Sequence, residues 1–406
     1  MESLILGGGV GGLTLALCLH RAGIPCRVYE AAPEIRQVGV GVNILPHASA
    51  ELAALGLEPA LKRVAVQTRD SYFFNRFGQL IHREALGVAA GYPHPQFSIH
   101  RGDLQGVLLE AVRERLGDAR IHTGHRVTRV EQDEAGVTVH FADGVAPVRG
   151  ACAIACDGIH SAVRRQFFPD EGPPRYSGVN MWRGVTRWKP FLSGAPMVRA
   201  GWLSTGKMVI YPIRELDGGE QLINWVAEIE TPQHLERDWN RKGRLEDFLP
   251  AFADWSFDWL DVPGLLRGAE TVLEFPMVDQ DPLPRWTHGL VTLLGDAAHP
   301  MVPRGSNGAG QSILDAVALE RHFKAKPIAG ALEDYAAERL PATAAVVLRN
   351  RSNPPDAILR EVWQRTGDKP FARIEDVISA EEIAAMSDGY KQVAGYTLSD
   401  VRSRVA

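Results

Sequence analysis

The chain has 406 residues, of which 45% are hydrophobic and 23% are charged, and its formal net charge is -5. A chain of this length and composition has enough apolar residues for two globular domains with a large core, which excludes the disordered and fibrous classes. The negative net charge argues against a nucleic-acid partner held mainly by charge. No apolar run approaches the roughly 18 residues that a membrane-spanning helix needs, so we predict no membrane span.

The chain start and the cysteines indicate the compartment. A predicted strand begins near residue 3, which leaves no room before it for a cleaved signal peptide. The four cysteines, at positions 18, 26, 152 and 156, show no C-x-x-C or Cys/His ligand spacing. We therefore expect a cytoplasmic protein with thiols in its core and no metal site.

The first stretch of the chain predicts a strand, a glycine turn and a helix. The apolar run Leu4–Leu6 precedes Gly7–Gly12, which carries a G-x-G-x-x-G pattern, and Leu13–Arg21 follows with helical periodicity. In such a turn the first glycine permits the tight bend and the second lets the backbone approach a pyrophosphate. The third lets the helix pack closely on the strand. The pyrophosphate would then lie at the positive N-terminus of the helix.

A carboxylate strengthens this interpretation. Glu30 directly follows a second predicted strand, Cys26–Tyr29, and stands 23 positions after Gly7. A ribose hydroxyl of a bound dinucleotide needs an acceptor at this place. The alternative is that Gly7–Gly12 forms only a flexible turn, but the flanking strand, the helix and Glu30 favour dinucleotide binding.

Periodicity predicts the remaining elements in chain order. Before residue 175 we expect helices over His47–Leu55 and Asp103–Leu116, hairpins of Tyr72–Phe74 with Leu80–His82 and of Val127–Glu131 with Val137–Phe141, and a buried strand over Ala151–Cys156. The next block is mostly β, with strands Val179–Val185, Lys207–Arg214, Gln221–Glu230 and Thr271–Phe275 and a helical excursion over Arg237–Phe252. A buried strand over Leu290–Leu294 and two long helices, Gly308–Lys324 and Gly330–Asn350, complete the pattern before a tail of short helices.

Three motifs stand at the ends of predicted parallel strands. Besides Gly7–Gly12 these are Asp157-Gly158 after the strand that ends at Cys156, and Gly295-Asp296 after the strand that ends at Leu294. In an open α/β sheet, ligands bind at this edge. Each dipeptide alone is usually a turn, but the three together predict a shared site.

These residues resemble a known family, the single-component (group A) FAD-dependent aromatic hydroxylases of the p-hydroxybenzoate hydroxylase type. The resemblance runs over about residues 1–350. It is carried by the G-x-G-x-x-G turn, Asp157-Gly158 and Gly295–Pro300, with Pro303 and Gly308 after it. Further stretches, such as Gly39–Ile44, Tyr92–Asp103 and Met181–Val185, resemble its phenazine-hydroxylating branch.

The resemblance implies an α/β fold with three parts. The first is a Rossmann-like FAD-binding domain of the GR2 type, made of residues 1–71, 96–175 and 276–352. An inserted antiparallel β-sheet domain, made of residues 72–95 and 176–275, would bind the substrate. Residues 353–406 would form a C-terminal helical tail.

The resemblance also implies the cofactor contacts. The FAD pyrophosphate would lie on Gly7, Gly9 and Gly12 with Val10 and Gly11 beside them, and Glu30 would accept from the adenosine ribose. Other FAD contacts are implied for Arg101 (the chain between flavin and phosphate), Val127 (adenine), Asp157 (FAD and reduced nicotinamide), Asp296 (a ribityl hydroxyl), and Pro303, Gly308 and Ala309 (the flavin ring). The chain has no second G-x-G-x-x-G, which fits a family without a separate nicotinamide domain.

Three side chains are candidates for contact with the substrate. Tyr211 lies on a strand of the β block and Asn43 follows the glycines at 39 and 41, and both match substrate-facing positions of relatives. Arg304 departs from the family pattern and would bind a substrate carboxylate or else point to solvent. Arg183 is interpreted as a hinge or interdomain ion pair, with ligand contact as the alternative, and His47 as a histidine on a helix surface.

The function implied by the resemblance is an NADH- or NADPH- and O2-dependent monooxygenase. It would hydroxylate a planar aromatic or heteroaromatic small molecule, phenazine-, hydroxybenzoate- or quinolone-like, through a C4a-hydroperoxyflavin. Alternatives on the same fold are a flavin-dependent reductase or dehydrogenase and a non-catalytic flavin-binding module. The W-x-W-x-I-P motif of flavin halogenases is absent from the sequence. The chain would act as a monomer or homodimer.

Overall fold

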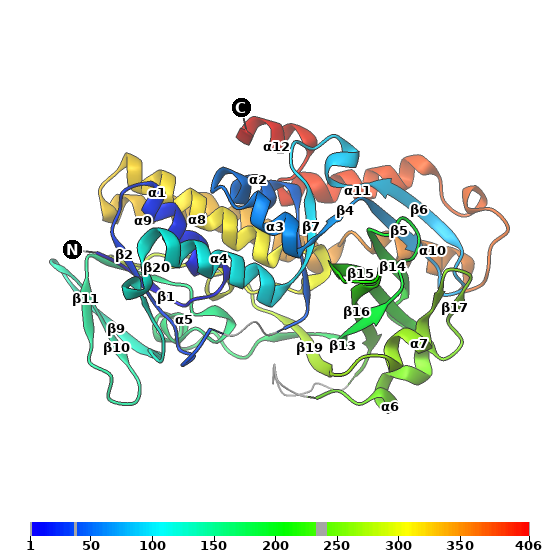
Figure 1. Ribbon diagram of the computed structural model, residues 1–406, viewed down its shortest axis with the longest axis horizontal. Coiled ribbons are helices and arrows are strands. Elements are labelled where there is room, and N and C mark those ends of the chain that lie inside the picture. The colour runs from blue at the N-terminus through cyan, green and yellow to red at the C-terminus, as the bar shows by residue number, and fades with distance from the viewer. Residues whose placement is uncertain (1, 36–38, 233–241, 406) are drawn as a thin grey trace.

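The computed structural model describes residues 2–35, 39–232 and 242–405, and Figure 1 shows two large sheets toward opposite ends of the molecule. The first is parallel, with the order β20-β12-β1-β2-β8. Its strands are β1 (Ser3–Leu6), β2 (Cys26–Tyr29), β8 (Ile121–His122), β12 (Cys152–Ala155) and β20 (Val291–Leu293). β1, β12 and β20 are buried throughout, as expected for parallel strands that are covered on both faces.

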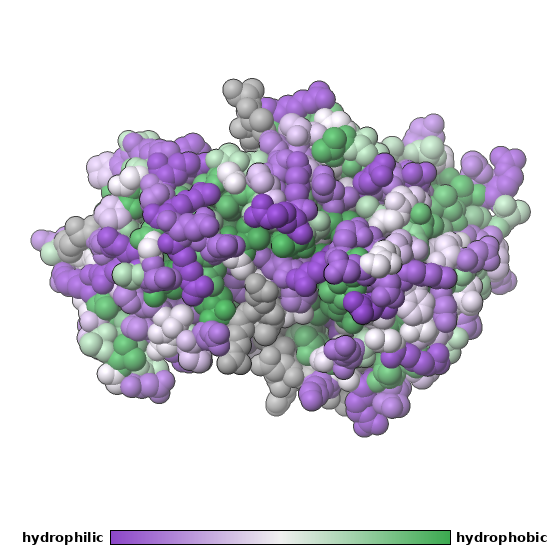
Figure 2. Space-filling model, in the orientation of Figure 1, coloured by the Kyte–Doolittle hydropathy of each residue, from purple (hydrophilic) through white to green (hydrophobic). Residues whose placement is uncertain are grey.

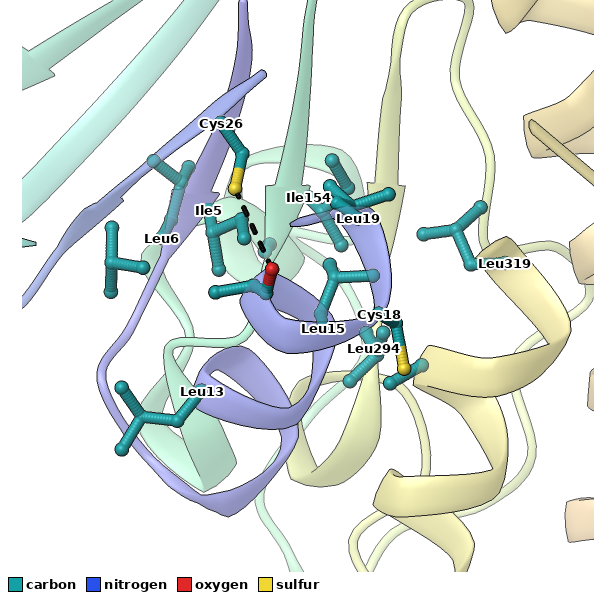
Figure 3. Packing of buried hydrophobic residues seen from close by; sticks show 14 of the residues in the cluster. Ile5, Leu6, Leu13, Leu15, Cys18, Leu19, Cys26, Ile154, Leu294 and Leu319 are labelled. Carbon is teal, nitrogen blue, oxygen red and sulfur yellow. Dashed lines mark hydrogen bonds between the residues drawn. The ribbon is translucent and has the colours of Figure 1, made fainter. Parts of the chain in front are cut away.

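Helices pack on the parallel sheet because their apolar side chains are buried against the apolar side chains of the strands. The helices of this part are α1 (Val10–Arg21), α4 (Arg101–Leu116), α5 (Ala162–Phe167), α8 (Gly308–Ala325) and α9 (Ile328–Ser352). Figure 3 shows Leu15 and Leu19 of α1 between Ile154 of the sheet and Leu319 of α8. Each such fully buried side chain stabilises the fold by about 1.5–3 kcal/mol. The close packing fixes α1 directly behind the glycine turn.

The second large sheet has seven strands in the order β19-β13-β16-β15-β14-β5-β6. They are β5 (Asp70–Phe74), β6 (Leu80–Ala85), β13 (Arg175–Trp188), β14 (Pro196–Trp202), β15 (Gly206–Glu215), β16 (Gln221–Glu230) and β19 (Val272–Asp279). All neighbours pair antiparallel except β14 and β5, which are parallel. The sheet therefore joins two chain segments that lie about a hundred residues apart in sequence.

The two faces of this sheet differ in chemistry. Trp182, Trp225 and Ile210 lie on one face and form an apolar cluster with the short helices α6 (Leu245–Phe248) and α7 (Val262–Arg267). The cross-strand pairs Arg183–Val226 and Lys207–Glu228 fall on the other face, because successive residues of a strand alternate between faces. This second face carries charged side chains although much of it is buried.

Smaller elements complete the fold. They are the sheet β3 (Gly41–Ile44), β7 (Gln96–His100) and β4 (Val66–Thr68), the sheet β11 (Val148–Gly150), β10 (Gly136–Phe141) and β9 (Val127–Asp133), the hairpin β17 (Ser256–Phe257) with β18 (Leu260–Asp261), and the helices α2 (Pro46–Ala54) and α3 (Glu58–Val64). Short 3-10 helices are spread along the chain, namely η1 (Gly87–Ala90), η2 (Asp118–Arg120), η3 (Gly158–His160), η4 (Leu249–Phe252), η5 (Gly295–Ala297), η6 (Pro303–Gly305) and η7 (Ile374–Asp376).

The tail after residue 353 forms α10 (Ala357–Thr366), α11 (Ala380–Ala394) and α12 (Leu398–Val405). In Figure 1, α10 and α11 lie along the antiparallel sheet, and α12 lies near α2. Figure 2 shows hydrophilic residues spread over the visible face and breaking up its apolar patches. Among the residues described, none of the helices is both long and apolar enough to cross a bilayer.

The predicted α/β fold is confirmed, whereas the proposed domain boundaries stay a prediction. Strands β3, β4, β7 and β14 were not predicted. β14 contains Ala200 and Gly201, which favour strands weakly, and it forms because both neighbours in the sheet pair with it. The predicted helical excursion is described only from residue 242 on, where α6 and η4 are helical, and residues 237–241 lie outside the described part.

Candidate active site

The glycine turn joins β1 to α1 as predicted, and two of its glycines are required by packing. Gly7 has a φ of +126°, and a Cβ at this residue would lie 2.2 Å from the carbonyl oxygen of Cys156. A Cβ at Gly12 would lie 2.0 Å from the carbonyl oxygen of Gly7, so only glycine lets α1 approach β1 this closely. A Cβ at Gly9, by contrast, would meet nothing within 4 Å and would point into open space.

Glu30 is held next to this turn. Its Oε2 accepts a hydrogen bond from the Gly8 N–H at 2.7 Å, and its Oε1 accepts from the Ala32 N–H at 2.8 Å. An ionised carboxylate has about four acceptor sites, so two remain for hydroxyl groups of a ligand. The fixed carboxylate fits the predicted ribose contact.

One cavity of about 310 Å³ extends from the glycine turn to the charged face of the antiparallel sheet. Many of the predicted cofactor and substrate residues line it, namely Gly9, Val10, Gly11, Asn43, Arg101, Tyr211, Asp296, Pro303, Gly308 and Ala309. Arg183, Glu228, Met301, Ser306 and Asn307 also line it. Residues from three parts of the chain therefore meet around one space.

The lining fits FAD on two independent grounds. The open backbone at Gly9 and the N-terminus of α1 offer N–H groups to a pyrophosphate. At the flavin end, Asp296 is exposed and lines the cavity, and α8 begins at Gly308 with its positive end at the same cavity. A helix N-terminus favours negative charge on a reduced flavin ring. When bound, FAD supplies the redox chemistry between the nicotinamide, O2 and the substrate.

Some predicted cofactor residues do not line the cavity. Gly7 and Gly12 act through packing, Glu30 stands behind the turn, and Val127 lies on β9, paired with Phe141. Asp157 accepts from the Ala162 N–H at 2.8 Å through Oδ2, while its buried Oδ1 has no hydrogen-bond partner among the described residues. Burial raises the pKa of Asp157 above its ordinary value, in spite of its hydrogen bonds with Ser161 and Ala162. The cofactor contacts predicted for these residues stay predictions.

The substrate side of the cavity is built from the charged sheet face and β3. Tyr211 is buried, and its hydroxyl group faces Arg183 and Asn43, which both favour its ionised form although burial outweighs them and raises its pKa. Arg183 donates from Nη2 to the Gly41 carbonyl oxygen at 2.7 Å, and its buried Nε–H has no hydrogen-bond partner in the described part of the chain. Burial lowers the pKa of Arg183, but a guanidinium group stays charged in proteins. A cation with an unpaired N–H therefore lines the cavity.

Behind this lining lies a buried charge cluster. Lys207 Nζ contacts Glu228 Oε2 at 2.9 Å and also pairs with Asp356, and all three side chains are at most 4% exposed. Glu228 lines the cavity, whereas Asp356 comes from the tail. Burial raises the pKa of Asp356, but Lys207 and Arg304 outweigh burial and hold it below its ordinary value.

Arg304 does not line the cavity. Its charge acts on Asp356, and its buried Nε has no hydrogen-bond partner among the residues described. The predicted contact of Arg304 with a substrate carboxylate is therefore not favoured by this arrangement, and Arg183 has the position expected for that role. His47 is 0% exposed and stacks on Tyr396, so the expectation of a surface histidine was wrong.

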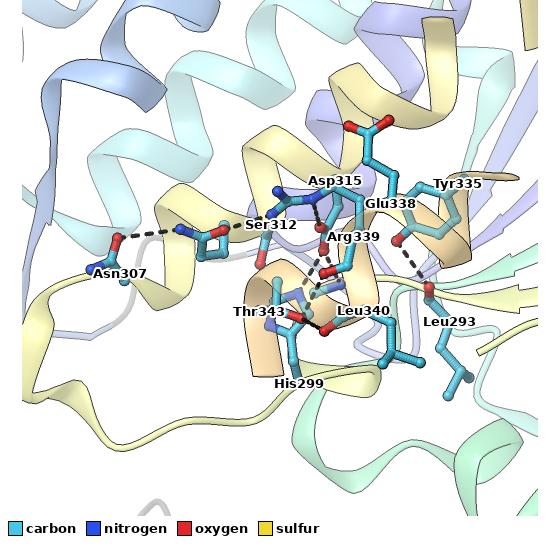
Figure 4. A network of polar contacts seen from close by, with 12 residues as sticks. Leu293, His299, Asn307, Ser312, Asp315, Tyr335, Glu338, Arg339, Leu340 and Thr343 are labelled. Atoms are coloured by element: carbon cyan, nitrogen blue, oxygen red, sulfur yellow. Dashed lines mark hydrogen bonds and ion pairs between the residues drawn. The ribbon is translucent and has the colours of Figure 1, made fainter. Parts of the chain in front are cut away.

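A polar network supports the Gly295-Asp296 turn from behind (Figure 4). Asp315 Oδ2 accepts from the Gly295 N–H at 3.1 Å and contacts His299 Nε2 at 2.6 Å, and its Oδ1 accepts from Arg339 Nε at 2.7 Å. Arg339 also donates to Gln311 Oε1 at 2.6 Å. Burial raises the pKa of Asp315, but His299 and Arg339 outweigh burial and lower it. An ionised, fully paired carboxylate thus fixes the turn.

Sequence reasoning gave no role to Glu228, Lys207 or Asn307. One signal was present in the sequence, because Lys207, Val209 and Tyr211 alternate along one strand, and so do Asn224, Val226 and Glu228. Each of these alternations has polar residues at both ends and a charged one at a single end, which marks a buried polar face only when the partner strand is known. Asn307 had no recognisable pattern.

Comparison with known proteins identifies the family. The family model described as "FAD binding domain" matches residues 1–181 and 274–350. The chain is 41% identical over 404 residues to the phenazine 1,6-dicarboxylic acid hydroxylase PhzS of Lysobacter antibioticus, covering 97% of both chains. It is 33% identical over 357 residues to the 3-hydroxybenzoate 6-hydroxylase of Polaromonas naphthalenivorans, covering 86% of both.

Solved structures show the same fold. Klebsiella pneumoniae HpxO complexed with FAD and uric acid aligns with a TM-score of 0.78 at 24% identity, covering 99% of this chain and 97% of that one. A salicylate hydroxylase substrate complex aligns with a TM-score of 0.74 at 25% identity over the same shares. The family model, the relatives and the site together show the cofactor to be FAD, with reduced nicotinamide and O2 as co-substrates. The chain belongs to the single-component FAD-dependent aromatic hydroxylases.

Proposed function

We propose that the enzyme hydroxylates a planar aromatic or heteroaromatic substrate that carries a carboxylate, with phenazine carboxylates as the leading candidates. The observation that carries this proposal is Arg183, a half-buried cation that lines the cavity and whose buried Nε–H has no hydrogen-bond partner among the described residues. A buried donor without a partner is costly, and a charge-assisted hydrogen bond to an anion removes this cost. The relatives named above act on a phenazine dicarboxylic acid and a hydroxybenzoate, which are both aromatic carboxylates.

The other lining residues take defined roles in this proposal. Asn43 and Tyr211 orient the ring beside Arg183 by hydrogen bonds. Glu228 faces the cavity and accepts a hydrogen bond or a proton from an N–H or O–H group of the substrate, while Lys207 holds it in place. Gly9, Asp296 and Gly308 hold FAD, with Glu30 and Arg101 toward its adenosine and phosphate parts. Closure of the cavity by the bound ring excludes water from the reacting atoms.

We also propose three domains for the chain. Residues 1–71, 96–175 and 276–352 form the FAD-binding domain, residues 72–95 and 176–275 the substrate-binding domain, and residues 353–406 the helical tail. We propose that the enzyme works in the cytoplasm, where reduced nicotinamide is supplied, as a monomer or homodimer. Light scattering at two protein concentrations distinguishes these two states.

A substrate panel tests the proposed function. Purified enzyme with FAD is given phenazine-1-carboxylate, phenazine-1,6-dicarboxylate and 3-hydroxybenzoate, each with its uncharged amide as a matched control. NADH and NADPH consumption is followed, and the masses of the products formed under ¹⁸O2 are measured by mass spectrometry. We expect a carboxylate to accelerate nicotinamide oxidation and gain one ¹⁸O atom, while its amide does so at least tenfold less. Peroxide formation at one rate with every aromatic compound would instead indicate a flavin reductase.

A further inference from the structure

The C-terminal tail contacts the loop that borders the flavin end of the cavity. This loop runs from Val302 to Asn307, and Pro303, Ser306 and Asn307 line the cavity. Ser306 has a φ of +55°, a left-handed backbone conformation that non-glycine residues rarely adopt. Such a conformation persists only where the surroundings hold it. Contacts with neighbouring segments must therefore hold the loop.

Tyr390 of α11 supplies the main contact. Its side chain is almost fully buried, and its hydroxyl group accepts from Asn307 Nδ2 at 2.9 Å and donates to Asn350 Oδ1 at 2.8 Å. A Cβ at Gly305 would lie 1.4 Å from the Tyr390 hydroxyl oxygen, so the phenol lies directly on the loop backbone. Asn350 Nδ2 donates in turn to the Val302 carbonyl oxygen at 3.3 Å. One phenol group thus joins the tail, the loop and α9.

The opposite side of Asn307 faces the network behind the cavity. Gln311 lies 3.5 Å from Asn307 Oδ1 and is bonded to Arg339, which pairs with Asp315 (Figure 4). Gln311 Nε2 also donates to the Ala394 carbonyl oxygen at the end of α11. The loop is therefore held between a rigid network of the parallel-sheet half and the tail.

A second anchor fixes the start of the tail at the other wall of the cavity. Asp356, which directly precedes α10, pairs with Lys207, and Lys207 contacts the cavity-lining Glu228. The intervening α10 buries Ile358, Leu359 and Val362 against the antiparallel sheet. The tail is thus fastened to both sides of the cavity, which leaves Tyr390 little freedom to move away from the loop.

We propose that Tyr390 is a positioning residue of the FAD site, and that through it the tail sets the conformation of the loop 302–307. The inference rests on the proposed place of the flavin beside this loop. Asn307 Nδ2 also donates to the Gly305 carbonyl oxygen at 3.0 Å, within the loop itself. Without the Tyr390 hydroxyl group, Asn307 keeps only this acceptor within the loop and loses its bond to the tail. The loop can then leave the conformation that presents Ser306 and the N-terminus of α8 to the flavin. FAD then binds more weakly, and reduced flavin is less well shielded from water.

The test compares Tyr390→Phe with Tyr92→Phe. Y390F removes one hydroxyl group and keeps the ring. Y92F also removes one hydroxyl group, and with it a hydrogen bond of 2.7 Å to the Tyr396 carbonyl oxygen of the tail, in which no residue of the loop 302–307 takes part. Apoproteins are titrated with FAD and followed by flavin fluorescence, and the flavin absorption spectrum and the peroxide formed per NADH are recorded. We expect Y390F to raise the Kd for FAD at least fivefold and the peroxide fraction at least twofold. Y92F should change neither.

Three results overturn the proposal. A Kd of Y390F within twofold of wild type does so, and so does an equal loss of FAD affinity in Y92F, which would indicate only a loosened tail. Should Y390F not fold, Asn350→Ser removes the same anchor from α9 and must raise the Kd in the same direction; an unchanged Kd rejects the proposal. The titration uses no aromatic substrate, so its outcome is independent of whether carboxylates are hydroxylated.

Discussion

The two ends of the cavity recognise ligands by different means. At the parallel-sheet end, the groups offered to a ligand are mainly backbone N–H groups in the glycine turn and at the start of α8, with the side chains of Arg101 and Asp296 beside them, while Asp315 acts from behind. At the antiparallel-sheet end, side chains from several strands reach into the cavity, with Arg183, Tyr211 and Glu228 among them. The first end suits a cofactor that never changes, and the second suits a substrate that differs between relatives.

This difference in construction has a physical consequence. A backbone-built site is harder to alter without disturbing the fold, since the same backbone forms the turn and faces the ligand, and at Gly7 and Gly12 a Cβ would clash with it. A side-chain-built site on a sheet can be altered residue by residue, because the strands are held by their own hydrogen bonds and by the apolar cluster on the opposite face. Substitutions at the first end should therefore change FAD affinity or, where the new atoms clash with the backbone, the stability of the fold, and those at the second should change substrate choice.

The largest expected effect is at the network behind the cofactor end. Asp315→Asn leaves Arg339 buried without its carboxylate partner, and such broken buried pairs cost about 3–5 kcal/mol. We expect a loss of this size in the free energy of unfolding of the apoprotein, measured with urea at pH 7. Glu338→Gln, on α9 next to Arg339, breaks an exposed pair with Arg321 and serves as the control, with a change below about 1 kcal/mol. Equal losses in both variants would contradict the assigned role.

The same carboxylate sets a pH dependence. Because His299 and Arg339 lower the pKa of Asp315 in the folded state, its stabilising effect is present above the unfolded pKa and is lost as the pH falls through the folded one. The stability difference between wild type and D315N should therefore be complete at pH 6 and should shrink below roughly pH 4. Urea unfolding at several pH values measures it. A stability difference between the two proteins that grows toward acid pH would contradict the expected direction of this pH dependence.

At the substrate end, Arg183→Met should change selectivity. Loss of a buried charge-assisted contact costs about 2–5 kcal/mol, so we expect kcat/KM for a carboxylated substrate to fall about 100-fold. The uncharged amide should lose less than about threefold. Arg187→Met, on the same strand but exposed and paired with Glu220, is the matched control and should leave both values unchanged. An equal loss for carboxylate and amide would assign Arg183 to the fold instead of the substrate.

Substitutions at two glycines of the turn distinguish a role in packing from a role in FAD binding. Gly12→Ala places a Cβ 2.0 Å from the Gly7 carbonyl oxygen, so we expect the apoprotein to lose about 1–3 kcal/mol of stability. Gly9→Ala meets nothing within 4 Å and should keep the apoprotein stability within about 1 kcal/mol, yet raise the Kd for FAD at least tenfold. Urea unfolding and FAD titration of both variants measure these values. Unchanged FAD affinity in G9A would place the pyrophosphate elsewhere.

The smallest effect is expected for Tyr211→Phe, which removes one hydroxyl group from the substrate end. A lost hydrogen bond of this kind costs about 0.5–1.5 kcal/mol, or roughly three- to tenfold in kcat/KM. Burial raises the pKa of Tyr211 above its ordinary value, so the phenol stays protonated at neutral pH. The pH profile of kcat between pH 6 and 9 should therefore be the same in both enzymes. A profile that changes shape would give Tyr211 a role in proton transfer.

The sequence predicts the cofactor end well and the substrate end poorly. The glycine turn and Gly295-Asp296 are recognisable because each is a short run of adjacent residues whose type is dictated by backbone geometry. Arg183 and Glu228 line the same cavity only because of the register between β13, β16 and β15. This register cannot be predicted from the sequence of any one of the three strands. Arg304 is the clearest case of a role that the sequence does not predict, because this cation of the predicted flavin loop acts electrostatically on Asp356, which lies 52 positions further along.

The order of strands in the two sheets affects how the chain reaches its fold. The parallel sheet needs β20, from residue 291 on, beside β12, and the antiparallel sheet needs β5, from residue 70 on, beside β14. Each sheet is thus completed by a strand distant in sequence, and contacts of this kind slow folding. During synthesis the nascent chain exposes an unpaired edge of β12 until β20 emerges, and unpaired strand edges of this kind favour aggregation.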